Sequence, residues 1–157
     1  MTVARTVLDN GIAIVTEQVP YLRSATAGIW VPVGSRAERP MESGIAHFIE
    51  HMLFKGTVRR KAIDISRAIE SVGGAMNAYT SREFTYFYAK AMEKDFSLLV
   101  DLLADIYRNS IFDEAELSRE KSVILQEILM VDDTPEEFFT NPKSTRAKDF
   151  LSKLLTQ

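Results

Sequence analysis

The sequence predicts an α+β fold, in which an antiparallel or mixed sheet carries helices on one face. Two observations lead to this prediction. Segments rich in β-branched and aromatic residues alternate with segments whose apolar residues recur at i, i+3 and i+4, which are strand and helix patterns respectively. The segments follow one another in the order βββ-αα-ββ-αα, and grouped strands and helices of this kind are typical of α+β proteins.

The opening part of the chain is predicted to consist of three strands. Two strand-like runs, residues 2–8 and 12–19, flank the dipeptide Asn10-Gly11. Asn-Gly is typical of tight hairpins because both residues accept a positive φ, so we expect these two runs to pair. A third strand is expected over residues 24–33.

Two helices should follow these strands. We expect Ser43 to cap the first helix, because a serine oxygen can accept hydrogen bonds from the first free backbone N–H groups, and we expect that helix to end near Gly56. The second helix, residues 61–72, is amphipathic and is closed by the pair Gly73-Gly74.

The second half repeats the pattern of strands followed by helices. Strands are expected over residues 75–79 and 84–92, and we interpret the many aromatic residues of this region as sheet packing. Helical spacing then predicts one helix over residues 96–107 and another that starts after Asp113 and runs to about residue 131.

Composition indicates an ordinary globular domain. The chain has 157 residues, of which 46% are apolar and 26% charged, enough for one domain with a core but not for two. A net charge of −3 gives no reason to expect nucleic acid or a membrane as a partner. No apolar run approaches the roughly 20 residues that span a bilayer, and the N-terminal residues do not resemble a signal peptide, so we expect a cytoplasmic location.

The motif that indicates a chemical function is His47-Phe-Ile-Glu50-His51, which contains the only two histidines of the chain. On a helix, at about 100° per residue, the two imidazoles lie roughly 40° apart on one face, with Glu50 beside them. Such a pair can hold Zn²⁺ and place a general base next to it. The alternative is that these are two ordinary histidines of an amphipathic helix. We expect the opposite face to pack on the core through Ile45, Phe48, Ile49 and Met52.

A catalytic zinc site needs a third protein ligand besides the two histidines. The chain has no cysteine and no further histidine, so the third ligand must be a carboxylate. The last predicted helix offers Glu120 and Glu127, which are seven residues apart and therefore lie on nearly the same face. Spacing alone does not choose between them, and either could be an ordinary exposed glutamate.

Three segments together resemble the pitrilysin-like (insulinase) zinc metallopeptidases, and most closely the bacterial members similar to the β subunit of the mitochondrial processing peptidase. They are GSRAERPMESGIAHFIEHMLFKGTVRR, ESVGGAMNAYTSREFTYFYAKAM and REKSVILQEILMVDDTPEEF. The resemblance covers residues 3 to about 139, in the same order and at the same spacings. It implies a metalloendopeptidase that hydrolyses extended peptides with a metal-activated water.

The resemblance also implies a role for individual residues. Glu127 matches the third zinc ligand of the family, whereas Glu120 matches a supporting glutamate that orients a ligand without binding the metal. Glu50 matches the general base, which takes a proton from the attacking water. Asn77 and Ala78 match the strand that pairs with the extended substrate.

The resemblance stops after Phe139, so we expect an incomplete, truncated zinc-binding peptidase domain over residues 1–139 and a divergent basic tail over residues 140–157. The tail could form a short helix over residues 144–155. The family clamps substrate between two halves, so a C-terminal half or a partner subunit is the expected partner besides the peptide or unfolded protein substrate. Two alternatives are a non-catalytic zinc-binding or structural subunit and an inactive fragment, and exposed sheet and helix faces would accompany the latter.

Overall fold

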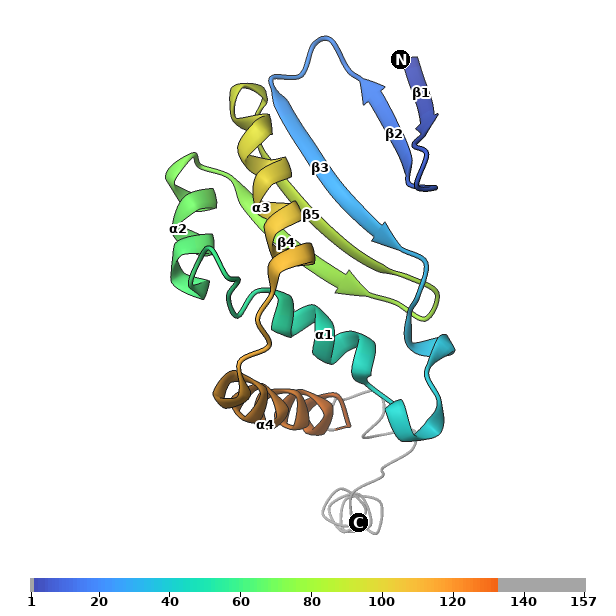
Figure 1. Ribbon diagram of the computed structural model, residues 1–157, viewed down its shortest axis with the longest axis vertical. Coiled ribbons are helices and arrows are strands. Elements are labelled where there is room, and N and C mark those ends of the chain that lie inside the picture. Colours follow the sequence, from blue (N-terminus) through green and yellow to red (C-terminus); the bar gives the residue numbers. More distant parts are fainter. Residues whose placement is uncertain (1, 133–157) are drawn as a thin grey trace, which may run out of the picture.

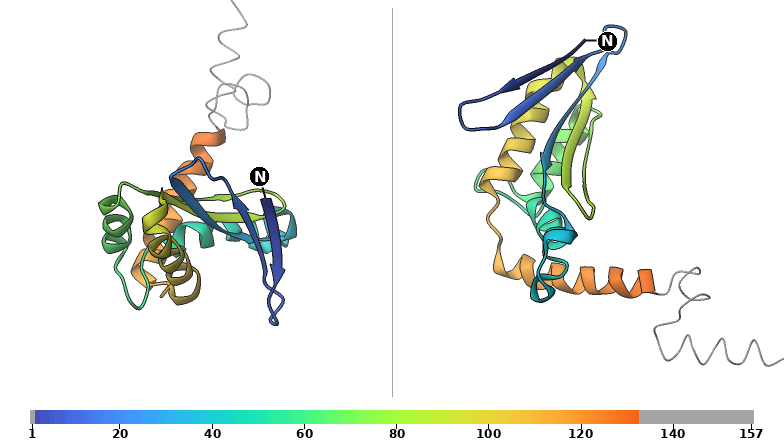
Figure 2. Two further views of the ribbon diagram at one scale, coloured as in Figure 1. Left: turned by 90° about the horizontal axis from the view of Figure 1, so that it is seen from above. Right: turned by 90° about the vertical axis from the view of Figure 1, so that its right-hand side faces the viewer.

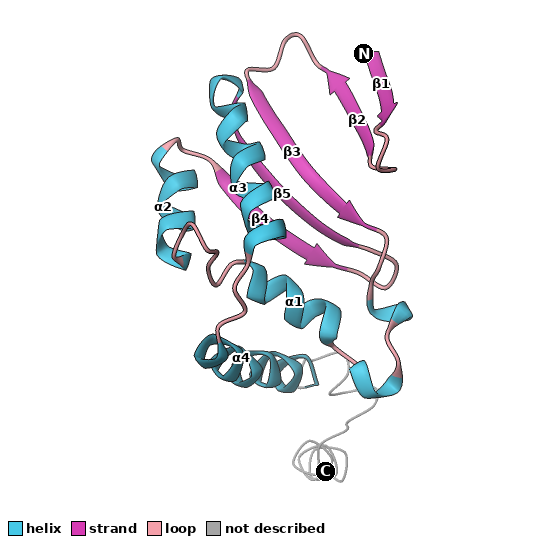
Figure 3. Ribbon diagram, viewed as in Figure 1, coloured by secondary structure: helices cyan, strands magenta, loops and turns pink. Residues whose placement is uncertain are grey.

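The structure is a computed structural model that describes the backbone of residues 2–132 and the side chains of residues 2–127. Its described elements confirm the α+β prediction and the predicted order of strands and helices (Figures 1 and 3). The tail, with its predicted helix over residues 144–155, lies outside the described residues. Within the described part, no helix is both long and apolar enough to cross a membrane.

The first two strands form a separate hairpin. β1 (Thr2–Val7) and β2 (Ala13–Gln18) pair antiparallel, as the Asn-Gly signal predicts. Gly11 has a φ of +87°, a conformation that residues with a Cβ rarely adopt. Every residue of the two strands is exposed, so the hairpin adds nothing to the core of the described residues.

The main sheet is antiparallel and has the strand order β3-β5-β4. Its members are β3 (Ser24–Val31), β4 (Ala75–Thr80) and β5 (Thr85–Met92), so β4 is an edge strand. Residues of β5 alternate between a buried and a more exposed face, which is the period expected of a sheet that is covered on one side.

The four helices are α1 (Ile45–Leu53), α2 (Ala62–Ser71), α3 (Phe96–Asn109) and α4 (Glu114–Asp132). Three of them, α1 to α3, pack on one face of this sheet, as predicted, whereas α4 packs on α1 beyond the end of the sheet (Figures 1 and 2). The core lies between the sheet and α3, with contributions from α1 and α2. It is built from Leu53, Ile65, Ile69, Phe87, Ala89, Ala91, Leu99, Leu102, Leu103 and Ile106.

The aromatic residues of β4 and β5 pack on the sheet, as predicted, and divide between its two faces. Only Phe87 packs in the core, whereas Tyr79, Tyr86 and Tyr88 belong to the opposite face of the sheet. Trp30 of β3 joins them, and its ring centroid lies 4.5 Å from that of Tyr86. The strand period explains the difference, because alternate residues must point to opposite faces even where all of them are aromatic.

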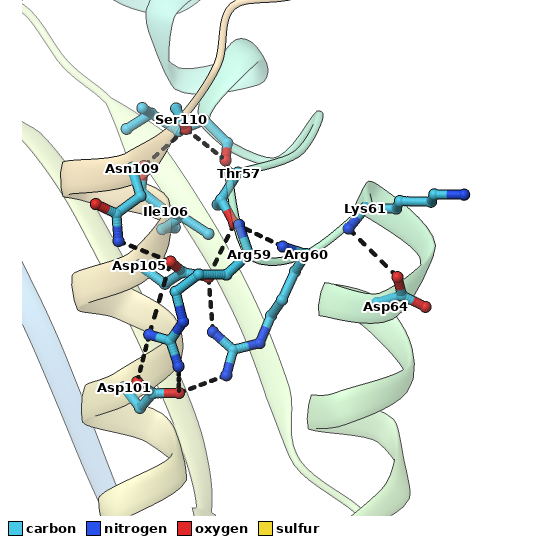
Figure 4. A network of polar contacts seen from close by, with 11 residues as sticks. Thr57, Arg59, Arg60, Lys61, Asp64, Asp101, Asp105, Ile106, Asn109 and Ser110 are labelled. Carbon is cyan, nitrogen blue, oxygen red and sulfur yellow. Dashed lines mark hydrogen bonds and ion pairs between the residues drawn. The ribbon is translucent and has the colours of Figure 1, made fainter.

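A polar network fixes the loop between α1 and α2 to α3 (Figure 4). Arg60 donates to Asp105 at 2.6 Å and to Asp101 at 2.5 Å, and Arg59 donates to Asp101 at 2.9 Å. Thr57 Oγ1 also donates to Asp105, which is almost completely buried. The loop that follows the C-terminal end of α1 is therefore fixed in place by hydrogen bonds to α3.

Candidate metal and catalytic site

α1 places both histidines and Glu50 on one side of a short helix, and its start differs from the prediction. Gly44, with a φ of +89°, is the N-cap, and no side chain at that position caps the helix. Glu38 does so from the preceding loop, because its carboxylate accepts the N–H groups of Gly44 at 2.7 Å and Ala46 at 2.8 Å. The prediction of Ser43 as the cap is wrong, since a nearby carboxylate with two oxygens satisfies the free donors instead.

The apolar face of α1 also differs in part from the prediction. Met52 and Leu53 are buried, but Ile45 and Ile49 are 46% and 40% exposed. All four lie on the same broad side of the helix, so their angular positions do not separate them. Their position along the axis does: Met52 and Leu53 lie in the last turn, which is buried, whereas Ile45 and Ile49 lie nearer the N-terminal end.

His47, His51 and Glu127 come together between α1 and α4. The two Nε2 atoms are 3.0 Å apart, and Glu127 Oε2 lies 3.7 Å from Nε2 of His47 and 3.8 Å from Nε2 of His51. Ligands about 2.0–2.1 Å from a tetrahedral Zn²⁺ ion are separated from one another by roughly 3.3 Å, which lies between these values. The three side chains are half-buried and thus accessible to solvent from one side. The donor set and its spacing fit a zinc ion.

Glu120 lies at the other nitrogen of His51. Its Oε1 is 2.7 Å from His51 Nδ1, and because a carboxylate only accepts, Nδ1 must carry the hydrogen. That tautomer leaves the Nε2 lone pair free to face His47 and Glu127. The structure thus separates the two glutamates that spacing left undecided, with Glu127 among the ligand atoms and Glu120 behind the ring.

Glu120 is buried and carries a second partner. Only 3% of the residue is exposed, and its Oε2 is 2.5 Å from Nζ of Lys55. Burial would raise the pKa of Glu120, but the hydrogen bonds from Lys55 and His51 outweigh this effect and hold the pKa below its usual value. Sequence reasoning missed Lys55, which stands four residues after His51. That spacing would place the two residues on one face of a continuous helix, but α1 ends at Leu53, so the contact comes from the loop that follows the helix.

The side chain of Glu50 is oriented by a hydrogen bond from the main sheet. The hydroxyl of Thr80, the last residue of β4, donates a hydrogen bond to Glu50 Oε2. The other oxygen, Oε1, has no hydrogen bond to a described residue. Sequence reasoning did not single out Thr80, and the only signal for it was its place in the NAYTSRE segment. A glutamate with one oxygen fixed and one free can exchange a proton with a molecule bound in the cavity.

Asn77 and Ala78 lie on the edge strand β4, next to this site. Asn77 lines an open cavity of about 230 Å³ together with Glu50, His51, Phe54, Lys55 and Glu120. The backbone N–H of Ala78 donates a hydrogen bond of 2.9 Å to Oδ1 of the neighbouring Asn77 side chain. The edge strand β4 thus borders the cavity beside the candidate metal site.

Comparisons with known proteins agree with this architecture. The model of the insulinase family (peptidase family M16) matches residues 13–150, so the chain belongs to that family. A zinc protease of Streptomyces coelicolor is 48% identical over 134 residues, and the mitochondrial-processing peptidase subunit beta of Bos taurus is 46% identical over 132 residues. The matches cover 85% and 84% of this chain but only 29% and 27% of those proteins.

A solved structure extends the agreement to three dimensions. The crystal structure of a protease from Helicobacter pylori superposes with a TM-score of 0.77 at 29% identity, over 80% of this chain and 30% of that one. The fold class and the family predicted from the sequence are therefore confirmed. The domain boundary at residue 139 and the roles given to individual residues stay predictions.

Proposed function

We propose that this chain forms the zinc-binding, general-base part of a metalloendopeptidase that hydrolyses extended peptides or unfolded proteins. The observation that carries the proposal is the convergence of His47, His51 and Glu127 beside Glu50, in a family whose relatives bear the names of zinc proteases. Zn²⁺ is the expected cofactor because the donor set is imidazole and carboxylate and the spacing suits tetrahedral ligands.

Glu50 would act as the general base. When bound, the metal would polarise the scissile carbonyl and make a water molecule more acidic. Glu50 would then accept a proton from the attacking water through its free Oε1 and deliver it to the leaving amine. The Thr80 hydroxyl supports this role because it fixes the other carboxylate oxygen.

The substrate would bind as an additional strand along β4. An edge strand presents unpaired backbone groups, and an extended peptide can pair with them whatever its side chains are. A substrate carbonyl that approaches Ala78 would replace the Asn77 side chain as acceptor of its N–H. Such a substrate would lie along the cavity that Glu50 and His51 line.

A partner is part of the proposal. The chain spans about a third or less of the length of the relatives it matches, so we propose that a C-terminal half or a partner subunit completes the substrate clamp. The same observation favours a second candidate, a zinc-binding unit that is not catalytic by itself. A cytoplasmic location remains a prediction.

A chelator-sensitive assay with a short unstructured peptide tests the proposal. We expect the chain alone to bind zinc and cleave slowly or not at all, because substrate positioning contributes much of the rate. Cleavage should appear when the remaining length of the Streptomyces coelicolor relative is supplied. Glu50→Gln should keep zinc but lower turnover about 10²–10⁴-fold.

Two results would contradict it. Near-normal turnover by Glu50→Gln would show that Glu50 is not the general base. Absence of zinc from the unsubstituted chain, measured by metal analysis after dialysis, would exclude the metal site itself.

A further inference from the structure

We infer that Lys55 is a positioning residue for the metal site, which acts on the ligand His51 through Glu120. This inference rests on the proposed zinc site but concerns a side chain that is not itself a ligand. Three contacts connect the residues in a row: Lys55 Nζ to Glu120 Oε2 at 2.5 Å, Glu120 Oε1 to His51 Nδ1 at 2.7 Å, and His51 Nε2 to His47 Nε2 at 3.0 Å.

The first argument is the geometry of the Glu120 carboxylate. Its two oxygens have different partners, one on each side, so the plane of the carboxylate is fixed. A carboxylate with one partner could rotate or withdraw, and the orientation of the His51 ring would follow it. Outer partners of this kind fix both the tautomer and the direction of a metal-binding imidazole.

The second argument is burial. Glu120 is 3% exposed, and a buried carboxylate without a compensating charge is strongly destabilised. Lys55 is the only Lys or Arg with an ion pair to Glu120 among the described residues. Removing the ammonium would therefore favour a rearrangement in which Glu120 leaves its present place.

The third argument is that the pair connects two elements that must both be in place. Lys55 lies two residues after the C-terminal end of α1, which carries both histidines, and Glu120 lies on α4, which also carries Glu127. The side chain of Glu127 is 43% exposed, and its Oε2 lies 3.7 Å and 3.8 Å from the two histidine Nε2 atoms, beyond hydrogen-bonding distance. The Lys55–Glu120 pair thus holds α4 at the distance from α1 that lets Glu127 reach the histidines.

The experiment measures zinc affinity of the whole 157-residue chain by competition with a chromogenic chelator. Lys55→Met, which keeps the length of the side chain and loses its charge, should bind zinc at least 10-fold more weakly. Lys55→Arg should recover most of that loss. The matched control is Arg119→Met, which removes an exposed ion pair of α4 with Glu116 and should leave affinity within 2-fold.

A second measurement separates positioning from a general loss of structure. Because the chain has only two histidines, ¹⁵N labelling of histidine resolves both rings in the metal-free protein. We expect His51 to be the Nδ1–H tautomer in the unsubstituted chain and a mixture of tautomers in Lys55→Met, with the far-UV circular dichroism of both proteins unchanged.

The outcomes distinguish the inference from the function on which it rests. Wild-type zinc affinity and an unchanged His51 tautomer in Lys55→Met would overturn the inference and leave the metal site standing. A Lys55→Met protein that has lost its circular dichroism would also overturn it, since the role of Lys55 would then be in folding. If the unsubstituted chain binds no zinc, the proposed function fails, and the tautomer still decides whether Lys55 positions His51.

Discussion

The Thr80 hydroxyl at the end of β4 donates a hydrogen bond to the carboxylate of Glu50 on α1. The two residues are 30 positions apart in the chain, and the bond joins the edge strand proposed to bind substrate to the proposed general base. Substrate binding along β4 and the orientation of Glu50 are therefore mechanically connected through one side chain.

Removal of the Thr80 hydroxyl should lower turnover without affecting the metal. In Thr80→Val we expect zinc affinity within 2-fold of the unsubstituted chain and a kcat about 5-fold lower in the reconstituted peptidase, because one orienting hydrogen bond contributes about 1 kcal/mol. Thr80→Ser keeps the hydroxyl and serves as the control. Equal kcat values for the Val and Ser variants would show that the bond has no catalytic role.

The two glutamates of α4 should differ in their effect on metal. Glu127→Gln removes a carboxylate oxygen from the ligand group, and we expect zinc to be lost at micromolar chelator concentrations. Glu120→Gln leaves the ligand atoms intact, and affinity should fall about 10–100-fold because the support of His51 is weakened. Zinc content measured after dialysis tests both variants. The assignment is wrong if Glu120→Gln loses zinc and Glu127→Gln retains it.

The cap on the motif helix should contribute measurably to stability. Glu38→Ala leaves the N–H groups of Gly44 and Ala46 without their acceptor, and we expect the free energy of unfolding to fall by about 1 kcal/mol. Urea denaturation followed by circular dichroism measures this change. Glu17→Ala, at an exposed position of β2, is the control and should change stability by less than about 0.5 kcal/mol.

The free energy of unfolding should fall in acid, in part because Asp105 becomes protonated. Burial would raise the pKa of this carboxyl, but hydrogen bonds from Asn109, Arg60 and Thr57 outweigh burial and hold the pKa below its usual value. A carboxyl with a depressed pKa in the folded state stabilises the fold above its unfolded pKa of about 3.9, and this contribution is lost as the pH falls through the lower folded value.

Urea denaturation at several pH values tests this prediction. We expect the contribution of Asp105 to be constant above about pH 5 and to decline below about pH 4. Asp105→Asn should be less stable at pH 7, by about 3 kcal/mol, and should lose part of the decline in acid. An Asp105→Asn protein whose stability depends on pH as steeply as the unsubstituted chain would contradict the role of Asp105.

Local patterns in the sequence were sufficient for much of this protein. The Asn10-Gly11 hairpin, the start of α4 after Asp113 and the pairing of two histidines one turn apart each depend on residues close together in the chain. Their geometry follows from the periods of strand and helix, which hold in any tertiary context. The family resemblance added the identity of the third candidate ligand, Glu127, which spacing alone had left open.

Only the tertiary structure decided which residues meet across elements. Glu120 and Glu127 are two helical turns apart on one face of α4, and the way α4 crosses α1 places one at each nitrogen of His51. Lys55, Thr80 and Glu38 reach their partners over longer separations in the chain, and no periodic pattern encodes such contacts. The angle and distance between packed elements depend on the whole core, so the sequence indicated the candidate ligands, and only the fold showed which side chains lie against them.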